Sequence, residues 1–112
     1  MREMTIYDAY RSHSPAEVAF PAQVTSEPRF FCGKRSQYTH ESFEAQTPAG
    51  PVEVVDNVTL APRIPVRPGD RIRIRGEMVH DPGREPIVHW THHDPEHRHA
   101  DGFIELRGRV YA

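Results

Sequence analysis

The chain has 112 residues, of which 37% are hydrophobic, 27% are charged and 11 are prolines. This length allows one domain with one small core, and the formal net charge of −2 argues against a bulk basic field for nucleic acid or anionic lipid. Cys32 is the only cysteine, so an intrachain disulfide is excluded. No stretch approaches the ~18 apolar residues of a membrane span, and the first residues lack the apolar core of a signal peptide. We therefore expect a cytoplasmic protein with no membrane partner.

Residues 1–15 predict a short N-terminal helical segment, and residues 16–112 predict a single β domain. Thr5 is a suitable N-cap for a helix that ends before Pro15. Residues 17–24 (EVAFPAQV) place apolar side chains at every second position, which is typical of a half-buried strand. Pro21 within it indicates a sheet edge or a bulge.

Residues 26–37 (SEPRFFCGKRSQ) predict a loop, followed by a hairpin of residues 38–47 and 52–58 around the turn sequence PAGP. The clearest strand lies in residues 65–79 (PVRPGDRIRIRGEMV). Isoleucines 72 and 74 face inward there, and arginines 71, 73 and 75 face outward. Gly76 interrupts this alternation and suggests a bulge or coil.

Residues 87–93 (IVHWTHH) predict another strand, and residues 103–112 (FIELRGRVYA) predict a last hairpin that turns at Gly108. Five or six short strands with one small helix favour an all-β fold, a small OB-like barrel. An immunoglobulin-type sandwich is the alternative, but its expected Cys and Trp pattern is missing. Trp90, Phe103 and Tyr111 are expected in the core, which leaves few exposed aromatics for single-stranded nucleic acid.

Five of the eight histidines lie in residues 88–102, VHWTHHDPEHRHADG. If the strand continues, alternation places His89, Thr91 and His93 on an outer or cleft face and turns His92 inward beside Trp90. Imidazole and carboxylate groups are ligands for Zn, Mn, Fe or Ni. The alternative is a hydrogen-bonded loop in which the aspartates at 94 and 101 cap backbone amides and the histidines brace the turn.

Four further residues are candidates outside this run: His40, Asp56, Asn57 and Arg63. His40 and Asp56 are expected near one end of the predicted hairpin, where His40 is a candidate ligand or general base. Arg63 lies in LAPRIP, where a buried guanidinium would organise a site. The arginines that follow are more typical of a solvated strand face whose charges pair with glutamates than of a face that contacts phosphate; they are Arg67, Arg71, Arg73 and Arg75.

The segments DNVTLAPRIP, PGDRIRIRGE and VHWTHHDPEHRHADGFIELRGRVYA resemble an uncharacterised bacterial domain-of-unknown-function family of short OB-like proteins. The resemblance covers roughly residues 37–112 and implies an OB-like fold without implying an activity. Family members commonly have histidine in place of Asp56, a glycine pair in place of Glu85 and Pro86, and glycine in place of His97. The matching polar residues are His40, Asn57, Arg63, His89, Thr91, His92, His93, Asp94, His99, Asp101 and Gly102.

Three functions are compatible with this pattern. The first is a divalent-metal-assisted hydrolase acting on a phosphodiester, with one Zn, Mn, Ni or Fe ion. The second is a non-enzymatic OB-like module that binds a small anion, a nucleotide or a partner protein, and the third is a purely structural His/Asp network. The expected roles are catalysis for His40, Arg63 and Asp94, metal binding for Asp56, His89 and His93, and ligand binding for Asn57, Thr91, His92, His99 and Asp101.

Overall fold

The computed structural model describes residues 3–112. They form one helix, α1 (Ile6–Arg11), and a set of short strands. The strands are β1 (Ala16–Val24), β2 (Arg29–Cys32), β3 (Thr39–Thr47), β4 (Gly50–Asn57), β5 (Arg71–Val79), β6 (Ile87–His89), β7 (Phe103–Leu106) and β8 (Arg109–Tyr111).

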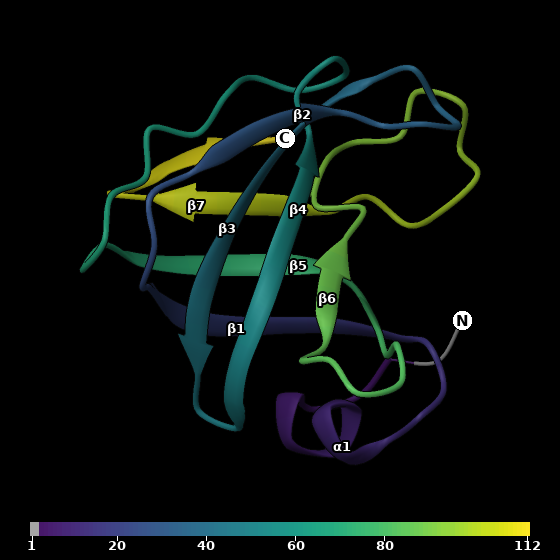
Figure 1. The fold of residues 1–112 in the computed structure, drawn as a ribbon, viewed down its shortest axis with the longest axis vertical. Coiled ribbons are helices and arrows are strands. Elements are labelled where there is room, and N and C mark those ends of the chain that lie inside the picture. Colours follow the sequence, from purple (N-terminus) through teal and green to yellow (C-terminus); the bar gives the residue numbers. More distant parts are fainter. Residues whose placement is uncertain (1–2) are drawn as a thin grey trace.

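Five of these strands close a mixed barrel. β1 pairs with β3, β3 with β4, β4 with β6, β6 with β5, and β5 returns to β1; only the β4–β6 pairing is parallel. Figure 1 shows β3 and β4 running steeply across β1 and β5. The predicted all-β, OB-like barrel is therefore confirmed. The β7–β8 hairpin extends the sheet from the first half of β5.

Alternation along the strands builds the core of the barrel. In β1 every second residue from Ala16 to Val24 is buried, and Phe20 is 1% exposed. At Pro21, β1 is paired with β5 on one side only, because its pairing with β3 is limited to Gln23 and Val24. The expected sheet edge at this proline is thus confirmed. Tyr111 belongs to the core as predicted.

The bulge expected at Gly76 is absent. β5 pairs with β1 without interruption from Arg71 to Met78. A Cβ added at Gly76 would lie 2.5 Å from the carbonyl oxygen of His89 and 2.9 Å from Cγ2 of Thr91. The glycine therefore reflects close packing of β5 against the segment after β6.

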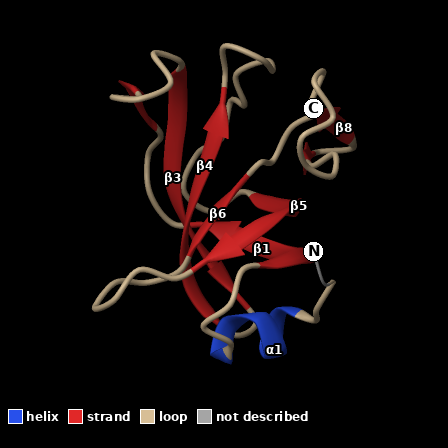
Figure 2. Cartoon of the chain, turned by 90° about the vertical axis from the view of Figure 1, so that its right-hand side faces the viewer, coloured by secondary structure: helices blue, strands red, loops and turns tan. Residues whose placement is uncertain are grey.

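The helix forms as predicted and lies at one end of the barrel (Figure 2). The Thr5 side chain caps it by accepting a hydrogen bond from the Asp8 backbone N–H at 3.1 Å. Ile6 and Ala9 are buried in the core. The Tyr10 hydroxyl donates to the backbone carbonyl of Pro51 at 2.8 Å, which ties the helix to β4. No helix in residues 3–112 is long and apolar enough to cross a membrane.

The segment expected as a loop at residues 26–37 contains a strand. β2 pairs with the first four residues of β3, and all four of its residues are exposed. Its stability comes from backbone pairing rather than burial, so the hydrophobic pattern carried no signal for it. The last hairpin is confirmed: Arg107 and Gly108 adopt φ values of 51° and 79°, as a two-residue hairpin turn of type I′ requires.

Candidate ring-lined cleft

A cleft of about 360 Å³ opens where β3 begins and β4 ends. The segment after β6 forms its other wall. We call it the ring-lined cleft. Its lining includes six of the residues singled out from the sequence, namely His40, Asn57, His89, His92, Asp94 and His99, together with Ser36, Tyr38, Val55, Leu60, Trp90, Pro95, Glu96 and Arg98.

Trp90 determines the shape of this cleft. β6 ends at His89, and Trp90 has a φ of 55°, a left-handed conformation that few non-glycine residues adopt. The prediction that His89, Thr91 and His93 share one strand face is therefore wrong: Thr91 is buried, and His93 is exposed.

The indole of Trp90 is half-buried between two imidazoles rather than packed in the core as predicted, and Phe103 is also only half-buried. The Trp90 ring stacks on His89 at 4.6 Å between centroids and on His99 at 4.4 Å, with interplanar angles of 15° and 3°. Three parallel rings thus form one wall.

The imidazoles of His40 and His92 also line the cleft. His92 is 3% exposed, as predicted, and its Nδ1 donates to the His93 carbonyl at 2.7 Å. His40 stacks on Phe31 at 5.4 Å between centroids. Desolvation by burial lowers the pKa of both imidazoles, and the proximity of His92 lowers the pKa of His40 further. A neutral imidazole has one donor and one acceptor nitrogen, and Nδ1 of His40 is buried without a partner in residues 3–112.

Asp94 organises the loop that carries this wall. Its carboxylate accepts hydrogen bonds from the backbone N–H groups of Glu96, Arg98 and His99. Desolvation raises the pKa of Asp94, but these three donors outweigh it and bring the pKa below its usual value. The backbone caps expected for a structural loop are therefore present.

Asp101 has the same role at the other end of the loop. Its carboxylate accepts from the Asp94 backbone N–H at 3.1 Å and from Nδ1 of His93 at 2.9 Å, and these bonds lower its pKa. His97 is exposed and adopts a φ of 55°. Glycine is favoured in that conformation, which agrees with the glycine that the family resemblance implies at this position.

Two carboxyl groups lie beneath the cleft, inside the barrel. Asp56 and Glu41 are directly opposite in the β3–β4 register, and both are 0% exposed. Asp56 accepts from the Thr91 hydroxyl at 2.7 Å, and Glu41 accepts from the Ile64 backbone N–H at 2.8 Å. The second oxygen of each carboxyl has no partner in residues 3–112.

Burial raises the pKa of Glu41 to about 7 and that of Asp56 to about 6. Two adjacent buried carboxyl groups do not both ionise readily, so Glu41 keeps its proton to a higher pH than an exposed glutamate does. Sequence reasoning did not select Glu41. Its inward position in alternation with Phe43 and Ala45 was the available signal.

The residues expected to share a metal have separate partners instead. Asp56 is bonded to Thr91, His89 to Glu77 at 2.6 Å, and His93 to Asp101. Among residues 3–112, no group of three or more His, Cys, Asp or Glu side chains is arranged to hold a metal ion.

His40 and Arg63 also differ from expectation. The register places His40 opposite Asn57, on the outer face of the hairpin, whereas Asp56 points inward. Asn57 caps the following turn through its Oδ1, which accepts from the Thr59 backbone N–H at 3.0 Å. The Arg63 guanidinium is exposed and lies 4.6 Å above the Phe30 ring, so the expected buried guanidinium is wrong.

Two solved structures share the fold. One is the tetrameric p202 HIN2 structure, with 15% identity and a TM-score of 0.59; it is matched over 95% of this chain and 49% of that chain, so this chain spans about half of its length. The other is the replication factor A related protein from Methanobacterium thermoautotrophicum, with 20% identity, a TM-score of 0.52, and coverage of 94% of this chain and 90% of that one.

No curated protein matches the sequence. Residues 33–112 match the family described as "Protein of unknown function (DUF3465)". This match contains β3 to β8 and every residue that lines the ring-lined cleft. The chain therefore belongs to the DUF3465 family.

Proposed function

We propose that this protein is a non-enzymatic binding module that holds a nucleotide by its base in the ring-lined cleft. The observation that carries the proposal is the wall formed by Trp90 stacked between His89 and His99. Because an imidazole covers each face of the indole, a planar nucleobase would extend this stack on the outer face of His89 or His99, and every nucleobase offers such a face. The cleft volume of about 360 Å³ lies within the range of small-molecule sites.

The electrostatics of the cleft favour a base over a phosphate group. The lowered pKa values of His40 and His92 favour the uncharged imidazoles at neutral pH, and since Nδ1 of His92 is hydrogen-bonded and Nδ1 of His40 is buried, Nε2 of each ring is the atom left for the edge of a heterocycle. The Arg98 guanidinium lies 2.6 Å from the Glu96 carboxylate, which offsets its charge. An isolated phosphate would find little net positive charge here.

The position of the cleft in the barrel supports the same proposal. OB folds bind oligonucleotides at the face of their second and third barrel strands and in the loop between the first two. β3 and β4 are these strands here, and β2 lies in that loop, with Phe31 44% exposed. This support is an analogy of fold, and the stacked rings supply the local chemistry.

A metal-assisted hydrolase is less well supported than binding. Thr91, Glu77 and Asp101 hold the side chains that such an enzyme would need as ligands. Asp94 and Asp101 accept backbone N–H groups of the loop, which favours a role for both in the folding of the cleft wall. We therefore propose that the aromatic and imidazole rings contact the ligand and that the two aspartates stabilise the loop that carries them.

Calorimetric titration with adenosine and uridine 5′-monophosphates tests the proposal, with ribose 5-phosphate as the ligand that lacks a base. We expect both nucleotides to bind and ribose 5-phosphate not to bind. A short single-stranded oligonucleotide shows whether the nucleotide is recognised free or within a strand. Equal binding of ribose 5-phosphate and the nucleotides would contradict recognition by the base.

His40→Ala and Tyr38→Ala remove two exposed or half-buried side chains from the lining and leave the core intact. Each is expected to weaken nucleotide binding by about fivefold or more, since His40→Ala removes a hydrogen-bonding imidazole and Tyr38→Ala removes a stacking ring, and loss of either contact costs about 1–3 kcal/mol. His13→Ala is the matched control, because His13 is exposed and lies against His80, outside the cleft. Equal effects of all three variants would place the nucleotide elsewhere.

A further inference from the structure

A second concave surface lies on a different part of the barrel. A groove of about 530 Å³ runs between β1, the first half of β5 and the β7–β8 hairpin. It meets β3 near Gln46, whereas the ring-lined cleft meets β3 at His40. Arg71, Arg73 and Arg107 line the groove together with Pro21, Ala22, Gln23, Gln46, Pro48, Ile72, Glu105 and Gly108, and we call it the arginine groove.

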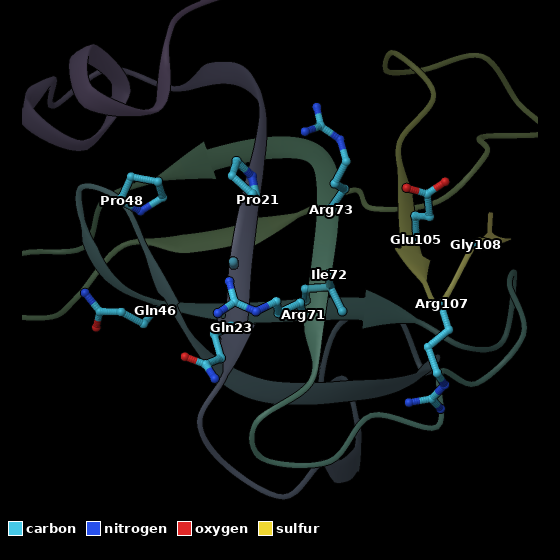
Figure 3. A pocket seen from close by; sticks show the side chains of 11 residues that line it. Pro21, Gln23, Gln46, Pro48, Arg71, Ile72, Arg73, Glu105, Arg107 and Gly108 are labelled. Carbon is cyan, nitrogen blue, oxygen red and sulfur yellow. The ribbon is translucent and has the colours of Figure 1, made fainter.

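The strand pattern explains why the arginines face this groove. The alternation in β5 buries Ile72 and Ile74 and leaves Arg71 and Arg73 exposed, about 6–7 Å apart along the strand. The tight β7–β8 turn supplies Arg107 from the side. Figure 3 shows Arg71 between Pro48 on one side and Gly108 on the other.

The charge of the groove is largely uncompensated. Arg71 and Arg73 form no ion pair or side-chain hydrogen bond with residues 3–112, whereas Arg75, next on the same face, pairs with Glu3 and Glu17. The sequence predicted that the arginines of this strand pair with glutamates. Of Arg71, Arg73 and Arg75, only Arg75 does so in residues 3–112.

The nearby acids offset only part of this charge. Arg107 lies 3.3 Å from Asp70, and Glu105 is the register partner of Arg73 on β7 without an ion pair between them. With Asp70 counted against Arg107, three arginines face two acids, which leaves a formal charge of +1 at the groove in a chain whose net charge is −2. The amides of Gln23 and Gln46 add neutral donors to the same surface.

We propose that the arginine groove binds a compact anion that carries two or more phosphoryl groups. Guanidinium forks donate paired hydrogen bonds to phosphate oxygens, and Figure 3 shows the forks of Arg71 and Arg73 pointing in different directions from one groove, so each would hold a different phosphoryl group. The turns that bear Pro48 and Gly108 bound the groove, which favours a compact anion over a long chain. This site does not depend on the function proposed for the ring-lined cleft.

Calorimetric titration with tripolyphosphate, orthophosphate and a short oligothymidylate tests this inference in the full chain. We expect tripolyphosphate to bind at least about tenfold more tightly than orthophosphate, because one phosphate engages fewer guanidinium groups. Tighter binding of the oligothymidylate, weakened by the same arginine substitutions, would overturn the compact-anion inference in favour of a phosphodiester chain.

Arg71→Gln and Arg73→Gln are each expected to weaken tripolyphosphate binding about tenfold or more. Both side chains are exposed, so the fold should not change. Arg71→Lys keeps the charge and loses the fork, and an intermediate affinity is expected. Arg35→Gln makes the same charge change at an exposed position outside the groove. Absence of tripolyphosphate binding, or equal weakening by Arg35→Gln, would overturn the proposed site.

Discussion

Replacing Glu41 by glutamine removes one of the two carboxyl groups that β3 and β4 bury side by side. The substitution keeps an oxygen that accepts from the Ile64 backbone N–H, and it adds an amide N–H opposite the unpaired oxygen of Asp56. The side chain keeps its size, so no cavity forms. The expected effect on folding is therefore electrostatic and depends on pH.

The magnitude follows from the proton equilibrium of Glu41. Burial raises its pKa from 4.5 to about 7 in the folded protein. A carboxyl group with a raised pKa contributes fully to stability below its unfolded pKa and loses that contribution as the pH rises through the folded pKa. At about 1.4 kcal/mol per pKa unit, the wild type loses about 3 kcal/mol from this group between pH 4.5 and 7. The E41Q variant has no ionisable group at this position and loses nothing from it over the same range.

Urea denaturation at pH 5, 6, 7 and 8 measures the difference in unfolding free energy between the E41Q variant and the wild type. We expect this difference to shift in favour of the variant by about 3 kcal/mol from pH 5 to pH 8. The lowered pKa values of His40 and His92 act in the opposite direction, since their contribution is lost as the pH falls. They are present in both proteins and therefore cancel to first order.

Glu27→Gln is the control, because it makes the same change on an exposed residue between β1 and β2. Its difference from the wild type should not vary with pH. If the E41Q difference were the same at pH 5 and pH 8, the raised pKa of the buried Glu41 carboxyl group would be refuted.

Other predictions concern the loop that carries the cleft wall. Gly102→Ala should lower the unfolding free energy measured in urea by about 3 kcal/mol, because its Cβ would lie 2.1 Å from the Trp90 carbonyl oxygen. The control, Gly83→Ala, has a positive φ and nothing within 4 Å of the added Cβ, and should lower it by only about 1 kcal/mol. Equal losses in the two variants would contradict this. His97→Gly should stabilise by about 0.5–1 kcal/mol by relieving a φ of 55°, and any destabilisation would argue against strain. Asp94→Ala should lower the melting temperature more than His93→Ala, since three backbone N–H groups lose their acceptor; the reverse order would contradict the capping role.

The barrel was predictable because its strands alternate clearly. Val18 and Phe20 in β1, and Ile72 and Ile74 in β5, repeat at every second position, as one-sided burial requires. The turn at Gly108 has the residue type that a positive φ favours. These local signals agree with the final packing, and the fold class followed from them.

Sequence reasoning singled out six residues that line the ring-lined cleft, but it did not predict how they are arranged. No local sequence signal indicates the left-handed backbone conformation of Trp90, since its neighbours favour a strand. That one conformation changes which of the following side chains face the cleft. Glu41 and Asp56 meet only through the β3–β4 register, which depends on the whole hairpin. β2 forms by backbone pairing with β3 while all four of its side chains stay exposed, so alternation of burial does not encode it.

The emission of Trp90 tests the central claim most directly. It is the only tryptophan of the chain, and its ring lies in the wall of the ring-lined cleft between His89 and His99. A saturable change of its fluorescence is predicted on titration with adenosine 5′-monophosphate, together with no change on titration with ribose 5-phosphate. Unchanged Trp90 emission while the nucleotide binds by calorimetry would show that the base lies elsewhere and would contradict the account.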